Sequence, residues 1–203
     1  MFWPKILLWL LTGMLVETTA GEPHVSIRID DQSAVAFADT NNAVSILLAL
    51  LRSSSVIADV EICSHQFSCS NQLAHNQVAI KIRPKKLTSY PHQLGQAFQV
   101  GTRGCLATIY APAVVEPADR AGVPRSAVLG YTLVHEVSHL LGLSHAPSGV
   151  MKEGLDVSDY RKMPSGDLRF SEEARQLIWA GALGRAGKDT AVSRPLIFLP
   201  VTP

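Results

Sequence analysis

The stretch HEVSHLLGLSH, residues 135–145, places three histidines, a glutamate and a glycine at fixed intervals within eleven positions. Because an α-helix turns once in about 3.6 residues, His135 and His139 project from nearly the same helical face. Two imidazoles in this arrangement can bind one Zn²⁺ at about 2.0–2.1 Å. Glu136 is the neighbouring residue and can reach a water at such a metal, which is what a general base requires.

Gly142 explains how a third histidine can join this pair. Glycine adopts a positive φ at little steric cost, so we expect Gly142 to end the helix and turn the chain. The turn would bring His145 back as a third nitrogen ligand, leaving one metal position open, as in catalytic zinc sites. Such a zinc ion lowers the pKa of a water ligand to about 7 and polarises a substrate carbonyl. Asp159, a carboxylate further along the chain, is the alternative third ligand. His145 is the better candidate, because the turn at Gly142 explains how it reaches the metal.

The sequence around this stretch predicts an α+β domain with one twisted sheet backed by helices. Alternation of apolar and polar residues predicts strands over residues 24–30, 56–63, 77–84, 94–98 and 105–115. Helical periodicity predicts helices over residues 42–52, from Pro124 to Gly142, and after Ser171. Residues 151–167 are expected to form a long irregular loop.

The N-terminal residues 1–20 have the layout of a signal peptide. Lys5 precedes an apolar run over residues 6–16, and small residues end at Ala20, where cleavage is expected. The run is about half of the roughly 20 residues that a membrane-spanning helix needs. We therefore expect a secreted or periplasmic protein with no membrane association after cleavage. A single zinc-binding domain would span residues 21–190, and a proline-containing tail residues 191–203.

Charge and cysteine content limit the possible binding partners and disulfide bonds of the protein. Lys and Arg total 18 against 17 Asp and Glu, without a basic cluster, which argues against nucleic acid as a partner. Cys63, Cys69 and Cys105 allow one disulfide and one free thiol in an exported protein. Cys63 and Cys69 would close a short loop, but Cys105 could replace either, so the pairing stays open.

The motif and the following APSGVM resemble the metzincin superfamily of zinc endopeptidases, in particular small exported bacterial proteins of the matrixin-like branch. The resemblance implies zinc ligands at His135, His139 and His145, a general base at Glu136, and a turn methionine at Met151 that packs without binding metal. It also implies a twisted, mixed five-stranded sheet with an antiparallel edge strand. An extended peptide or protein substrate would add to that strand, which comprises Leu94, Gly95, Gln96, Ala97 and Phe98.

Two departures from the family pattern concern the segment after the motif. Met151 follows His145 by only six residues, and Glu153 stands where some metzincins carry a tyrosine. Tyr160 is a candidate substitute, although an ordinary core or surface tyrosine is the plainer interpretation. The sequence predicts a secreted zinc-dependent endopeptidase. The alternative is a catalytically silent, zinc-containing peptide-binding or protein-binding domain of the same fold, which would have no need of Glu136.

Overall fold

A computed structural model describes residues 21–33, 37–64, 73, 76–85, 93–100 and 103–192. Its centre is a five-stranded sheet in the order β2-β1-β3-β5-β4. Neighbouring strands run parallel except β4, which pairs antiparallel with β5 at the edge. The strands are β1 (His24–Asp31), β2 (Ile57–Ser64), β3 (Gln77–Arg83), β4 (Gly95–Val100) and β5 (Arg103–Tyr110). The predicted α+β class and antiparallel edge strand are confirmed.

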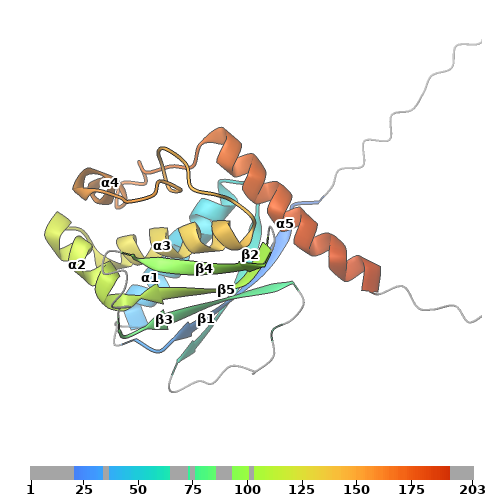
Figure 1. The fold of residues 1–203 in the computed structure, drawn as a ribbon, viewed down its shortest axis with the longest axis horizontal. Helices are drawn as coiled ribbons and strands as arrows, with labels where there is room; N and C mark the ends of the chain where they lie inside the picture. Colours follow the sequence, from blue (N-terminus) through green and yellow to red (C-terminus); the bar gives the residue numbers. More distant parts are fainter. Residues whose placement is uncertain are drawn as a thin grey trace, which may run out of the picture.

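Two helices, α1 (Phe37–Arg52) and α3 (Arg125–Leu140), pack closely against each other beside the sheet. Figure 1 shows α3 running alongside β4 and β5. At Gly130 the two helices approach so closely that an added Cβ would lie 2.8 Å from Ile46 Cβ. The motif therefore lies on a helix that is packed on both sides, which limits how far it can move.

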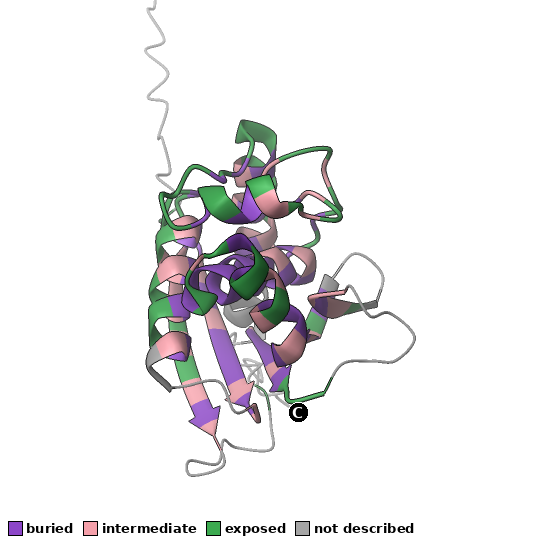
Figure 2. Ribbon diagram, turned by 90° about the vertical axis from the view of Figure 1, so that its left-hand side faces the viewer, coloured by how far each residue is buried: buried purple, intermediate pink, exposed green. Residues whose placement is uncertain are grey.

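The core fills the space between this sheet and these helices. Inward-facing strand residues and the apolar stripe of α3 are almost wholly buried: Val25, Ile27, Ile29, Val78, Ile80, Ile82, Ile109, Leu129, Leu133, Val137 and Leu140. Figure 2 shows long buried stretches in the strands, and more exposed turns on the outer helices. Burial of these side chains stabilises the fold by roughly 25 cal/mol per Å² of apolar surface.

The strand predicted over residues 105–115 is wrong in its last five residues. β5 ends at Tyr110, and Ala111 begins α2 (Ala111–Ala121). Pro112 lies in the first turn of the helix, where its missing N–H costs nothing. The buried side of α2 consists mainly of alanines, a small and weakly apolar face that is easily taken for part of a strand. Gly122, with a φ of 68°, ends the helix.

The loop predicted over residues 151–167 contains a short helix, α4 (Val157–Lys162). Asp156 caps it, because the Asp156 carboxylate accepts hydrogen bonds from the backbone N–H groups of Ser158 and Asp159. The Asp159 carboxylate accepts from the Asp156 N–H in return, completing a capping box. An aspartate at both ends of the box, in place of the commoner glutamate at its second position, hid this helix from the sequence prediction.

The remaining helix and the chain ends complete the comparison with the prediction. α5 (Glu172–Val192) begins after Ser171, whose hydroxyl accepts a hydrogen bond from the Ala174 N–H at 3.1 Å. The predicted signal peptide, residues 1–20, and the tail beyond Val192 lie outside the described residues. Within the described ranges, no helix has the length and apolar character that crossing a membrane demands. Cys63 is disulfide-bonded and Cys105 is free and exposed, while Cys69 lies outside the described residues.

Candidate metal centre and substrate cleft

The three predicted histidine ligands come together at the C-terminal end of α3. The helix ends at Leu140, and Gly142, with a φ of 104°, turns the chain as the sequence predicted. This turn returns His145 to the helix, where its Nε2 lies 3.2 Å from His139 Nε2. One nitrogen from each of His135, His139 and His145 lies within 4.8 Å of the other two.

Backbone carbonyls fix the orientation of the two helix-borne rings. His135 Nδ1 donates to the Val150 carbonyl at 2.8 Å, and His139 Nδ1 donates to the Leu143 carbonyl at 2.7 Å. Because a carbonyl oxygen only accepts, both Nδ1 atoms carry the proton of the neutral ring. Both Nε2 atoms therefore present lone pairs, and these atoms are 3.0 Å apart.

Two lone pairs at this separation repel each other unless a cation lies between them. A shared proton is disfavoured near neutral pH, since burial lowers the pKa of His135 to about 4. Burial also lowers the pKa of His139. The neutral nitrogen donor set, with its orienting hydrogen bonds already formed, fits a divalent metal ion such as Zn²⁺.

The short connection from His145 to Met151 forms a tight turn. The Ala146 N–H donates to the Met151 carbonyl at 2.8 Å, and Gly149 adopts a φ of 75°. The turn holds the Val150 carbonyl against His135, as described above. Met151 itself is only 1% exposed and belongs to the hydrophobic core.

Glu136 is buried beside the histidines, with only 4% of its surface exposed. Its Oε2 has no hydrogen-bond partner among the described residues. Burial raises the pKa of the Glu136 carboxyl to about 8, and its charge is a secondary cause, after burial, of the raised pKa of Tyr110. A carboxyl whose pKa lies near neutrality can both accept and release a proton at physiological pH.

These groups open into a cleft of about 790 Å³. The edge strand lines one side with Gln93, Leu94, Gly95, Gln96 and Ala97, while the exposed Phe98 lies beyond it. Residues of α3 line the base of the cleft: Tyr131, Thr132, His135, Glu136 and His139. His145, Lys152, Glu153, Gly154, Leu155 and Tyr160 complete the lining. The predicted edge strand and the histidine motif, about forty positions apart in sequence, thus face the same cleft.

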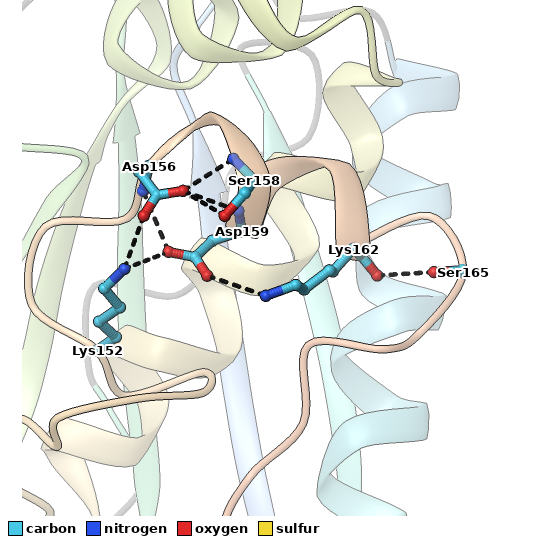
Figure 3. Close-up of polar contacts among 6 residues, drawn as sticks. All are labelled: Lys152, Asp156, Ser158, Asp159, Lys162 and Ser165. Atoms are coloured by element: carbon cyan, nitrogen blue, oxygen red, sulfur yellow. Dashed lines mark hydrogen bonds and ion pairs between the residues drawn. The ribbon is translucent and has the colours of Figure 1, made fainter.

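Ion pairs link Lys152 and Lys162 to the aspartates at the start of α4, as Figure 3 shows. Lys152 Nζ contacts Asp156 Oδ2 at 2.9 Å and Asp159 Oδ2 at 2.6 Å. Lys162 Nζ lies 3.7 Å from the other oxygen of Asp159. Asp159, the alternative third metal ligand, is therefore paired with two lysines and does not join the histidine cluster. These contacts anchor α4 and with it Tyr160, which is buried and lines the cleft.

Sequence reasoning did not identify several residues of this site. Lys152 and its aspartate partners carry only a weak signal, a cation directly after the turn methionine followed by two aspartates three positions apart. Tyr131 and Thr132 carry none beyond their place one turn before His135 on the helix. Glu153, noted only for the missing tyrosine, places its Oε2 3.9 Å from His145 Nδ1.

Comparisons with known proteins identify solved structures with a similar fold. No protein-family model matches the sequence, and no curated protein matches it. The structure is similar to that of archaemetzincin from Methanopyrus kandleri, with a TM-score of 0.52 and 14% identity, covering 78% of this chain and 95% of that one. The fold is metzincin-like.

A second solved structure supports the same assignment. Metalloproteinase-II from Bacteroides fragilis gives a TM-score of 0.51 at 14% identity, over 81% of this chain. The match covers 53% of that chain, so this protein corresponds to about half of it. Identities this low establish the fold alone.

Proposed function

We propose that this protein is a secreted or periplasmic zinc-dependent endopeptidase of the matrixin-like branch, exported by a signal peptide over residues 1–20. The facing lone pairs of His135 and His139, with His145 alongside, carry the proposal. They provide three nitrogen donors, two of them oriented by backbone carbonyls, in a cleft that also contains a buried carboxyl. N-terminal sequencing of the exported protein tests the export step and is expected to begin at Gly21.

The donor set defines what the metal would contribute. A zinc ion held by His135, His139 and His145 would acidify a water ligand and polarise the scissile carbonyl of the substrate. Glu136 would accept the proton of the attacking water and pass it to the leaving amine. Burial favours the second of these steps, because it raises the pKa of the Glu136 carboxyl to about 8 and so helps the carboxyl to hold the proton before passing it on.

The edge strand would align an extended peptide by backbone pairing. The Tyr110 N–H donates to the Leu94 carbonyl at 2.9 Å, so the backbone groups of Leu94 face β5. Hydrogen-bonding direction alternates along an antiparallel pair, and Gly95 and Ala97 therefore direct their N–H and C=O groups away from β5. These two residues would form the backbone bonds with substrate, in the cleft that the three histidines also line.

The substitution Glu136→Gln tests the proposal. It keeps the size of the side chain but removes the proton acceptor, so peptide cleavage should fall by at least about 100-fold. Zinc content should stay at the wild-type level because the histidines are untouched. Cleavage of a broad peptide mixture, with and without chelator, and metal analysis of the same samples provide the measurement.

Glu173→Gln, an exposed position on α5, is the matched control and should cleave like the wild type. Wild-type cleavage by Glu136→Gln would exclude Glu136 as the base. A wild-type protein that binds zinc but cleaves no peptide would support the silent binding domain instead.

A further inference from the structure

The edge strand β4 closely approaches the helix of the histidine motif, α3, at Gly95. This glycine is buried and faces α3, since its antiparallel partner Ile109 belongs to the buried inner face of the sheet. A Cβ added to Gly95 would lie 2.6 Å from Glu136 Oε1 and 2.9 Å from Glu136 Cδ. Optimal separations between nonbonded carbon atoms are about 3.5–4.0 Å. The position thus has no room for any side chain while Glu136 keeps its place.

Neither neighbour can yield without consequence. The added Cβ would also lie 2.9 Å from the backbone oxygen of Thr108 on β5. That carbonyl belongs to the strand pairing, so a shift there would distort the sheet edge. The Glu136 carboxyl is the more flexible of the two groups, but its movement is restricted because Glu136 is only 4% exposed. A side chain at position 95 would therefore displace the carboxyl from its present position.

The same residue also faces substrate under the proposed function. Its N–H and C=O groups point to the open edge of β4, while its missing side chain leaves space for Glu136. We infer that Gly95 is a positioning residue. Its backbone groups can pair with substrate at the strand edge, while the absence of a side chain lets the Glu136 carboxyl lie directly against the same residue. This inference rests on the proposed function for the role of Glu136, but the contact itself does not.

A double-mutant cycle on stability tests the contact without any need for activity. Gly95→Ala should lower the melting temperature in the wild-type background, and by a smaller amount when Glu136 is already replaced by alanine, because only the contact with the Thr108 oxygen then remains. Failure of Gly95→Ala to fold, with folding restored in the Glu136→Ala background, would show the same coupling. Equal losses in both backgrounds would overturn the inference.

Gly130→Ala provides the matched control. Gly130 lies on the same helix as Glu136, and its added Cβ would meet Ile46 and Ala43 instead. It should lower the melting temperature equally in both backgrounds. A coupling with Glu136 as large as that of Gly95 would indicate a general effect of destabilisation and overturn the inference.

Kinetics then test the positioning role. A displacement of about 1 Å at a catalytic group can cost about 100-fold in rate, and Gly95→Ala keeps the backbone groups that pair with substrate. We expect a loss of about that size in kcat, with KM and zinc content near wild type. An unchanged kcat would overturn the positioning role. Absence of cleavage by the wild type would defeat the proposed function, while the stability cycle would still decide the contact.

Discussion

The two parts of the candidate metal centre are held in place in different ways. His135 and His139 lie on α3, and each is fixed by a hydrogen bond to a backbone carbonyl. His145 lies on the following turn, with 44% of its side chain exposed, and its Nδ1 is 3.9 Å from the Glu153 carboxylate, which is 82% exposed. Burial and backbone bonds fix the first part, whereas the second is more exposed and has the Glu153 carboxylate nearby. Exposed charges are weak and are screened by salt, so the second part should be the adaptable one.

The largest expected effect comes from His139→Ala. His139 Nε2 lies 3.0 Å from His135 Nε2 and 3.2 Å from His145 Nε2. Its loss therefore removes the nitrogen that lies next to both of the other donors. Zinc affinity should fall by more than the roughly 100-fold that loss of an outer partner can cost. The metal-free protein should also melt lower, because the bond to the Leu143 carbonyl is lost. Chelator competition and thermal unfolding measure the two effects.

His145→Ala sharpens the comparison. It should also weaken zinc binding strongly, but the melting temperature of the metal-free protein should stay near wild type because the ring is half exposed. If the melting temperatures of the two metal-free variants fell by the same amount, the distinction between a buried part and an adaptable part would be wrong.

An intermediate effect is expected at Lys152. Lys152 and Lys162 both pair with the buried Asp159, but only Lys152 also reaches Asp156 and lines the cleft. Lys152→Met should speed hydrogen exchange of the α4 amides several-fold and raise KM, because the wall carrying Tyr160 loses its anchor. Lys162→Met, whose side chain is 51% exposed, is the control and should change neither. Equal effects of the two substitutions would show that the anchor is not specific to the cleft side.

The smallest effect is expected from Glu153→Gln. Loss of the carboxylate near His145 should weaken zinc binding by roughly 10-fold at most, the lower end of the range for outer partners. The difference should vanish at about 1 M salt, where charges are screened beyond roughly 3 Å. Zinc affinity measured at low and high salt provides the test, with Glu173→Gln as the control. A loss that persists at high salt would show that Glu153 acts by packing and not by charge.

Local patterns in the sequence predicted much of this fold. Alternating residues in β1 and β3, and the apolar stripe of α3, produced correct elements because burial on one face imposes a fixed period. The errors lie where the local signal was weak. α2 buries small alanines, and α4 depends on two aspartates that cap each other, so neither shows a strong apolar period.

The candidate site also has a part that the sequence predicted and a part that it did not. The interval between His135 and His139, and the turn at Gly142, predicted the convergence of the three histidines correctly. The roles of Gly95 and Lys152 depend on contacts between segments that the sequence does not connect. Gly95 meets Glu136 only because the sheet places β4 beside α3.

The sequence by itself determined which residues could bind a metal, because helical spacing and a glycine turn are local properties of eleven consecutive residues. Tertiary structure alone decided how those residues would behave. Packing against β4 removes water from Glu136 and raises the pKa of its carboxyl to about 8. The fold also places the Val150 carbonyl against His135 and the Glu153 carboxylate beside His145. Proton affinity and ring orientation depend on surrounding atoms, and only the folded chain brings those atoms together.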